Sequence, residues 1–245
     1  MAEIGPNSVL PARREPITLQ AADGLKLVGE IALPENGEPS ALLITVHPLP
    51  THGGSMQSHL FRKMAWRLPA LAGIAVLRFN TRGTTSPDGT SEGSFDNGYL
   101  EGNDLNAAID WAASRGLPDP WLVGWSFGTD VILRHGNRQP VRGAILLSPP
   151  LRTITDAELA AWSDSNRPVI ALIPEHDEFL PPKEARDRFK PLTKANIVEV
   201  AGAKHLWTGE PYVRQVLNQI VQVVAPNRAP LPNTWDGPMT KWSDL

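Results

Sequence analysis

The chain of 245 residues contains no cysteine, which excludes disulfide bonds, a thiolate nucleophile and any metal site built on cysteine. It also lacks a run of about 18 apolar residues, and no apolar stretch accompanies the arginine pair near its start, so we expect neither a membrane span nor a signal peptide. Neither sign of charge dominates, because 23 Lys and Arg oppose 26 Asp and Glu. We therefore expect no nucleic-acid partner, no membrane partner and a cytoplasmic location.

What is present is an alternation of short apolar runs with amphipathic stretches, which predicts an α/β fold. Strands are expected at 41–46, 73–79, 121–125, 142–147, 169–173 and 197–200. Helices are expected at about 55–70, 102–114, 129–135, 155–162, 183–189 and 212–224. A hairpin around Asp23-Gly24 precedes them, so the sheet should hold about eight strands, be mostly parallel and carry helices on both faces.

The end of the chain differs in composition from the rest. Residues 225–245 contain four prolines and two tryptophans and show no periodicity. We therefore predict one domain over residues 1–224 and an extended C-terminal tail over 225–245, packed on the surface or on a partner chain. A frayed terminus and a homo-oligomer both stay open at this point.

The most informative motif is Gly-Trp-Ser-Phe-Gly at residues 124–128, between an expected strand and an expected helix. Strand, Gly-x-Ser-x-Gly and helix form a nucleophile elbow, a sharp turn that exposes a serine hydroxyl. Residues 89–93 match the same pattern, but a polar turn precedes them instead of a strand. We therefore select Ser126 as the nucleophile and reject Ser91.

A serine hydroxyl needs a base to take its proton and a carboxylate to orient that base. In chains with a nucleophile elbow the order is Ser, then Asp or Glu, then His, with each partner just past a later strand. His205 follows the expected strand at 197–200, and Asp177 follows the strand at 169–173. We predict the triad Ser126, Asp177 and His205. Other acids that stay open in place of Asp177 are Glu175, Glu178 and, more remotely, Asp164.

The developing oxyanion requires backbone N–H donors. One is Phe127, next to the nucleophile. The second should lie in the loop after the strand at 41–46, where the two prolines have no N–H to donate. Leu49 is therefore the expected donor, with Thr51 as the fallback.

Four segments in register carry a family resemblance: His-Pro-Leu-Pro-Thr-His-Gly-Gly at 47–54, Val-Leu-Arg-Phe-Asn-Thr-Arg-Gly at 76–83, Glu-Gly-Ser-Phe-Asp-Asn-Gly at 92–98, and the elbow. Together they resemble a group of small, lidless bacterial α/β-hydrolases, similar to serine esterases and to dienelactone-hydrolase-like enzymes. The likeness covers about residues 41–224. It implies an α/β-hydrolase fold without a separate lid domain, and the same triad. Leu49, where the group commonly has a second histidine, and the tail depart from it.

The remaining chemistry-bearing residues receive simpler interpretations. Trp125 and Trp207 flank the triad positions, so we expect them to line the substrate pocket. His47 is expected to shape its loop by hydrogen bonding. His52, His176 and Asp177 match no metal-ligand spacing, so we expect no metal, and nothing in the sequence indicates a cofactor.

The sequence thus predicts a serine hydrolase that cleaves a small carboxylic ester through an acyl-enzyme. The interval 148–168, where such folds commonly carry a lid, has room for one helix of about 12 Å, so we expect an accessible site that favours short acyl chains. A thioesterase, a peptidase and a non-catalytic binding protein on the same fold stay open as alternatives.

Overall fold

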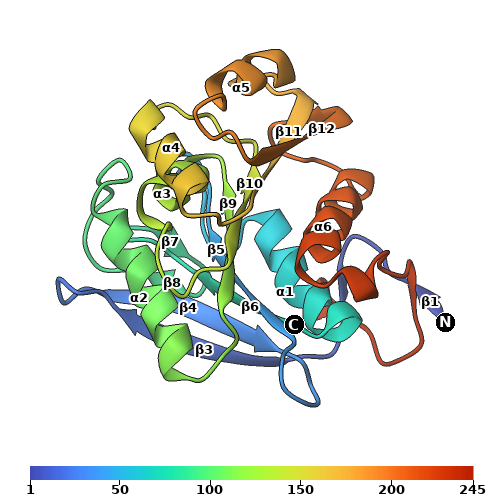
Figure 1. Ribbon diagram of the computed structural model, residues 1–245. Coiled ribbons are helices and arrows are strands. Elements are labelled where there is room, and N and C mark those ends of the chain that lie inside the picture. Colours follow the sequence, from blue (N-terminus) through green and yellow to red (C-terminus); the bar gives the residue numbers. More distant parts are fainter. Residues whose placement is uncertain (245) are drawn as a thin grey trace.

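The computed structural model describes residues 1–244, and an eight-stranded sheet forms its centre (Figure 1). The strand order is β12-β11-β10-β9-β5-β6-β4-β3. The strands are β3 (Arg13–Gln20), β4 (Lys26–Leu33), β5 (Ala41–Val46), β6 (Ile74–Phe79), β9 (Pro120–Trp125), β10 (Gly143–Leu147), β11 (Val169–His176) and β12 (Ala195–Lys204). Strands β5, β6 and β9 to β12 pair in parallel, whereas β4 pairs antiparallel with both β3 and β6. The predicted mostly parallel sheet is confirmed.

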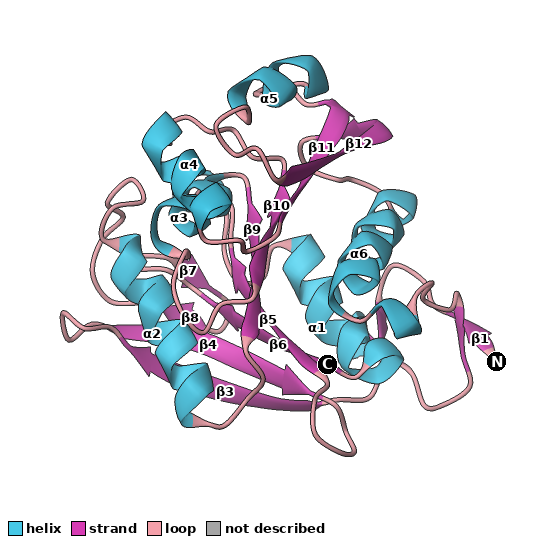
Figure 2. Cartoon of the chain, in the orientation of Figure 1, coloured by secondary structure: helices cyan, strands magenta, loops and turns pink. Residues whose placement is uncertain are grey.

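Helices cover both faces of this sheet (Figure 2). Helices α1 (His59–Ala72) and α6 (Glu210–Val224) share one hydrophobic core with one face of the sheet. Helices α2 (Glu101–Ser114), α3 (Phe127–His135), α4 (Asp156–Asp164) and α5 (Pro182–Arg188) share the second core with the other face. Strands β5, β6, β9 and β10 are buried throughout, as expected of parallel strands between two helical layers.

The N-terminal segment and the C-terminal tail lie along one another. The two-residue strand β1 (Ala2–Glu3) pairs with β13 (Thr234–Trp235), and β2 (Ser8–Val9) pairs with β14 (Thr240–Lys241). Before β13 the tail forms η2 (Pro226–Arg228), and after β14 it forms η3 (Trp242–Asp244). The described part of the tail is therefore extended and packed on this chain. The domain boundary at residue 224 stays a prediction.

Near its end the tail contacts α1. The ring centroids of Trp66 and Trp242 lie 6.2 Å apart. The Arg62 guanidinium lies 4.9 Å from the first ring and 4.6 Å from the second. Stacking of a guanidinium on aromatic rings holds the tail to α1.

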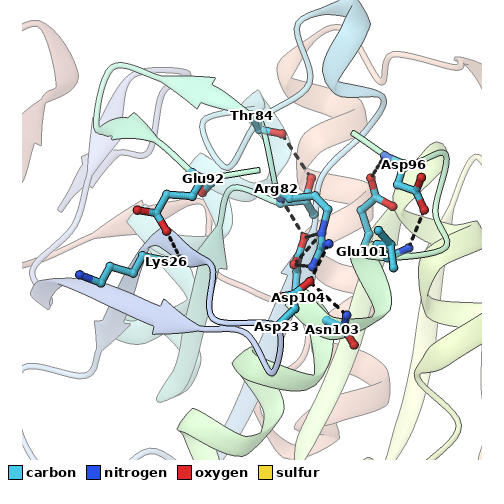
Figure 3. A network of polar contacts seen from close by, with 12 residues as sticks. Asp23, Lys26, Arg82, Thr84, Glu92, Asp96, Glu101, Asn103 and Asp104 are labelled. Carbon is cyan, nitrogen blue, oxygen red and sulfur yellow. Dashed lines mark hydrogen bonds and ion pairs between the residues drawn. The ribbon is translucent and has the colours of Figure 1, made fainter. Parts of the chain in front are cut away.

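The long loop between β6 and α2 contains the small strands β7 (Thr85–Ser86) and β8 (Gly89–Thr90), and polar contacts fasten it to α2 (Figure 3). Arg82 donates to the buried Asp104 (Nη2 to Oδ1, 2.7 Å) and pairs with Asp23 (Nη1 to Oδ2, 2.9 Å). The carboxylate of Glu101 accepts the Gly98 N–H (2.9 Å). These acids at the start of α2 do more than complement the helix dipole, because they also fix the shape of the loop.

No helix within residues 1–244 is long and apolar enough to cross a membrane.

Candidate active site

Ser126 stands at the sharp turn between β9 and α3, with φ 52° and ψ −119°. Such a backbone is strained for a residue with a side chain, and neighbouring structure must hold it in place. A Cβ at Gly128 would lie 2.0 Å from the Val46 carbonyl oxygen, and one at Gly124 would lie 2.8 Å from the backbone of Gly128. The two glycines are therefore required so that β5, β9 and α3 can pack closely around the turn.

The serine hydroxyl starts a chain of two hydrogen bonds. Ser126 Oγ lies 2.9 Å from His205 Nε2, and His205 Nδ1 lies 2.9 Å from Asp177 Oδ2. Asp177 directly follows β11 and His205 directly follows β12, so the carboxyl ends of parallel strands bring the three residues to one edge of the sheet. The structure thus joins the three side chains that the sequence selected.

Asp177 is held as an ionised acceptor. Its Oδ1 accepts the backbone N–H groups of Phe179 (2.9 Å) and Leu180 (3.2 Å). Burial alone would raise the pKa of Asp177, but the hydrogen bonds from His205 and these N–H groups hold that pKa below its usual value. An ionised Asp177 accepts a hydrogen bond from a protonated Nδ1 of His205. The other ring nitrogen, Nε2, is then free to accept the serine proton.

The other acids near the end of β11 do not touch His205. Glu175 accepts the Gly202 N–H (2.7 Å) and so braces the turn within β12. Glu178 lies exposed on the wall of the cleft. Asp164 ends α4. Sequence position alone left these acids open, whereas the geometry distinguishes them.

Sequence reasoning missed Phe179, Ser148 and His59, which hold His205 in position either directly or through Trp125. The edge of the His205 ring packs against Phe179, with ring centroids 4.5 Å apart. The His205 carbonyl oxygen accepts from Trp125 Nε1 (3.1 Å) and Ser148 Oγ (3.2 Å). His59 packs edge-on against Trp125 at 5.3 Å. Only the fold brings these residues together, and no local motif marks Ser148, Phe179 or His59.

Ser126 and His205 open into a cleft of about 840 Å³. Leu49, Phe127 and Trp125 line it, together with Phe95 and Asn97 from the long loop. Within residues 1–244, the N–H groups of Leu49 and Phe127 donate to no other group. Both are therefore available to an atom bound in the cleft.

Trp207 does not lie where we expected it. Its side chain is fully buried in the core beside α1 and α6, and it is not among the residues lining the cleft. The chain turns after His205, and the positive φ of Trp207 (52°) directs this ring inward. Its neighbour Leu206, 60% exposed, lines the cleft instead.

His47 fixes the loop after β5 without facing the cleft. The ring is fully buried, its Nδ1 donates to the Pro48 carbonyl (2.7 Å), and its Nε2 accepts the Thr81 N–H (3.0 Å). Burial lowers the pKa of His47 to about 4, so the ring is neutral at pH 7. The loop is further tightened at Gly54, where a Cβ would lie 2.0 Å from the Pro48 oxygen.

Thr51 also lines the cleft, beside His52, whose Nδ1 lies 3.1 Å from the Thr51 hydroxyl. His176 lies apart, 57% exposed and facing Glu175. Among the described residues, no three His, Asp or Glu side chains are grouped so that they could hold a metal ion.

Helix α4, the only helix between β10 and β11, does not cover the cleft. None of its residues lines the cleft, and its Leu159 and Trp162 are buried in the core. Trp162 Nε1 donates to the Leu133 carbonyl at the end of α3 (2.9 Å). The site is therefore open to solvent on the side where a lid would lie.

Solved structures of the same architecture place the chain in a superfamily. It is 29% identical to a lidless α/β serine hydrolase from Xanthomonas campestris, with a TM-score of 0.71 over 93% of this chain and 99% of that one. It is 27% identical to an α/β serine hydrolase homologue from Coxiella burnetii, with a TM-score of 0.72 over 85% and 96%. The chain belongs to the α/β-hydrolase superfamily.

More distant likenesses add the fold alone. An esterase from Pyrococcus furiosus is 17% identical, with a TM-score of 0.70 over 85% of this α/β-hydrolase and 90% of that chain. An uncharacterized protein of Rickettsia prowazekii is 28% identical over 149 residues, which span 60% of each protein. No family model matches the chain.

Proposed function

We propose that this protein is a serine hydrolase that cleaves carboxylic esters through an acyl-enzyme. The observation that carries the proposal is the hydrogen-bonded chain of Ser126, His205 and Asp177 at a strained elbow that opens into a cleft. The likeness to a serine hydrolase at 29% identity and to a serine hydrolase homologue at 27% identity supports hydrolase chemistry in general.

In the proposed reaction Ser126 Oγ attacks the ester carbonyl carbon while His205 Nε2 takes the hydroxyl proton. The carbonyl oxygen gains the negative charge and accepts hydrogen bonds from the Leu49 and Phe127 N–H groups. The tetrahedral intermediate then expels the alcohol, which leaves with the proton from His205. A water molecule then attacks the acyl-enzyme in the same way, giving its proton to His205. The carboxylic acid departs as Ser126 regains a proton from His205.

Asp177 acts through His205. Its carboxylate keeps the proton of the neutral ring on Nδ1 and stabilises the positive charge that the ring carries in each transition state. The low pKa of Asp177 matches this role, because the carboxylate must stay ionised beside the imidazolium.

We further propose that short acyl chains, of about two to six carbons, are preferred. The cleft is open and α4 leaves it uncovered, so a long alkyl chain would remain partly in water. Its volume of about 840 Å³ exceeds that of a short acyl group and leaves room for the alcohol.

A fluorophosphonate probe tests the proposed nucleophile. We expect stoichiometric labelling of the wild-type protein at Ser126 and complete loss of labelling and of esterase activity in Ser126→Ala. Ser91→Ala is the control, because Ser91 shares the sequence pattern but is 1% exposed and donates to the Asn80 carbonyl (2.8 Å). It should keep its labelling, and labelling that survives in Ser126→Ala would reject the proposal.

A further inference from the structure

Arg152 is the one arginine or lysine among the residues that line the cleft. It is exposed, and within the described chain its side chain forms no ion pair and no hydrogen bond. The neighbouring Arg134, in contrast, pairs with Glu158 at 2.8 Å. A guanidinium that is left without a partner at a substrate cleft is available to bind a negative charge.

The loop between β10 and α4 holds Arg152 in place. The preceding Leu151 is buried and has a positive φ of 49°. The following Thr153 donates through its N–H and its hydroxyl to Asp130 of α3, at 3.3 and 3.2 Å. Both neighbours of Arg152 are thus anchored, so little backbone freedom would be lost when it binds a ligand.

Phe179 links Arg152 to the site described above. The Arg152 guanidinium lies 4.8 Å from the centre of the Phe179 ring, and that ring packs against His205. This contact with the ring is not a hydrogen bond, so the guanidinium N–H groups stay available for a bidentate contact with a carboxylate. The ring of Phe179 therefore lies between the Arg152 guanidinium and His205.

Two acids also line the cleft and oppose this charge only weakly. Asp130 is buried, its Oδ2 already accepts from Thr153, and burial raises its pKa. Glu178 is exposed and does not come within 4.0 Å of the Arg152 nitrogens. Neither acid neutralises Arg152 by direct contact.

We propose that Arg152 selects esters that carry a second, ionised acid group, such as a half-ester of a short dicarboxylic acid. This inference rests on the proposed esterase function and specifies its substrate class. The carboxylate would pair with the Arg152 guanidinium while the ester carbonyl lies between Ser126 and the Leu49 and Phe127 N–H groups.

The kinetic test compares 4-nitrophenyl hexanoate with the 4-nitrophenyl half-ester of adipic acid, which has the same acyl length but ends in a carboxylate. We expect the wild-type protein to prefer the half-ester, and Arg152→Gln to lower the ratio of the two kcat/KM values about tenfold. Arg152→Lys should restore part of the ratio, since it keeps the charge and loses the planar fork. Added salt should lower the preference in the wild-type protein.

Two controls separate the local effect from net charge. Arg13→Gln removes an exposed positive charge from β3 at the far edge of the sheet and should leave the ratio unchanged. Glu178→Gln removes the acid nearest Phe179 in the sequence and should raise the ratio or leave it unchanged. A ratio that is the same in Arg152→Gln and wild type, or that falls equally in Arg13→Gln, would overturn the inference.

A binding measurement keeps this test independent of turnover. Monomethyl adipate should bind the Ser126→Ala protein in calorimetry, and the added Arg152→Gln substitution should weaken its binding about tenfold. Equal binding by both proteins would reject the role of Arg152 even if esters are cleaved. Ester cleavage that persists in Ser126→Ala would instead reject the proposed nucleophile and leave this binding result to decide on Arg152.

Discussion

Among the four acids considered for the triad, Asp177 is the one whose carboxylate reaches the His205 ring. The sequence could place Glu175, Asp177 and Glu178 near the end of one strand, but side chains two residues apart in an extended chain lie on the same side, so alternation alone could not separate Asp177 from Glu175. What distinguishes Asp177 is the tight turn after β11, in which its other oxygen accepts two backbone N–H groups. Contacts of this kind depend on the path of the loop and are invisible in a strand-and-helix pattern.

Asp177→Asn tests the orienting carboxylate. The amide cannot stabilise an imidazolium and favours the wrong tautomer of His205, so we expect kcat for a short ester to fall by about 10³- to 10⁴-fold with the fold intact. Glu178→Gln, which removes a charge from the adjacent residue, should change kcat less than threefold. If Glu178→Gln is the more damaging change, Asp177 has been given the wrong role.

At the scale of elements, apolar runs were sufficient to predict the six parallel strands of the sheet, because buried parallel strands are largely hydrophobic. The Asp23-Gly24 turn predicted the hairpin of the two antiparallel strands β3 and β4. The small strands such as β1 and β13 were not predicted, since two residues carry no periodicity and pair only through tertiary contacts. Trp207 shows a second limit. Because it lies two residues after His205, we expected Trp207 to line the cleft. The backbone turns after His205, and the Trp207 side chain is buried in the core.

His47 joins the loop after β5 to the segment after β6. Because its ring is buried, we expect the stability of the protein to depend on pH. Its pKa is about 4 when folded and about 6.5 when unfolded, so below pH 6.5 the unfolded chain binds the proton more readily. The free energy of unfolding should fall by about 2 kcal/mol between pH 7.5 and 5 from this residue alone.

Urea unfolding of wild type and His47→Gln at both pH values measures this contribution. The variant should be less stable at pH 7.5 and should lose less stability on acidification, because it has no ring to protonate. Other titrating groups are common to both proteins and cancel in the comparison. Parallel losses of stability in the two proteins would contradict the buried neutral state of His47.

At the scale of the whole molecule, the most consequential feature is that the cleft has no cover. The sequence predicted that the interval between β10 and β11 holds a single helix, and α4 is that helix. The sequence could not say which way it packs. Its buried Leu159 and Trp162 hold it against the core beside α3, away from the cleft.

An uncovered cleft predicts the response to chain length and to interfaces. For 4-nitrophenyl esters, kcat/KM should peak between two and six acyl carbons, since each added methylene contributes about 0.8 kcal/mol only while it finds apolar surface to cover. No jump in rate should occur when the ester concentration passes its solubility limit, because no lid has to move. A kcat/KM that keeps rising to twelve carbons would instead reveal an extended apolar trench.

The most direct test of the account is to detect the acyl-enzyme itself. Wild-type protein mixed with excess 4-nitrophenyl butyrate and quenched in acid within the first turnovers should carry one butyryl group, and peptide mapping should locate that group on Ser126. Ser126→Ala treated in the same way should carry none. Turnover without a covalent adduct, or an adduct on any residue other than Ser126, would contradict the proposed mechanism.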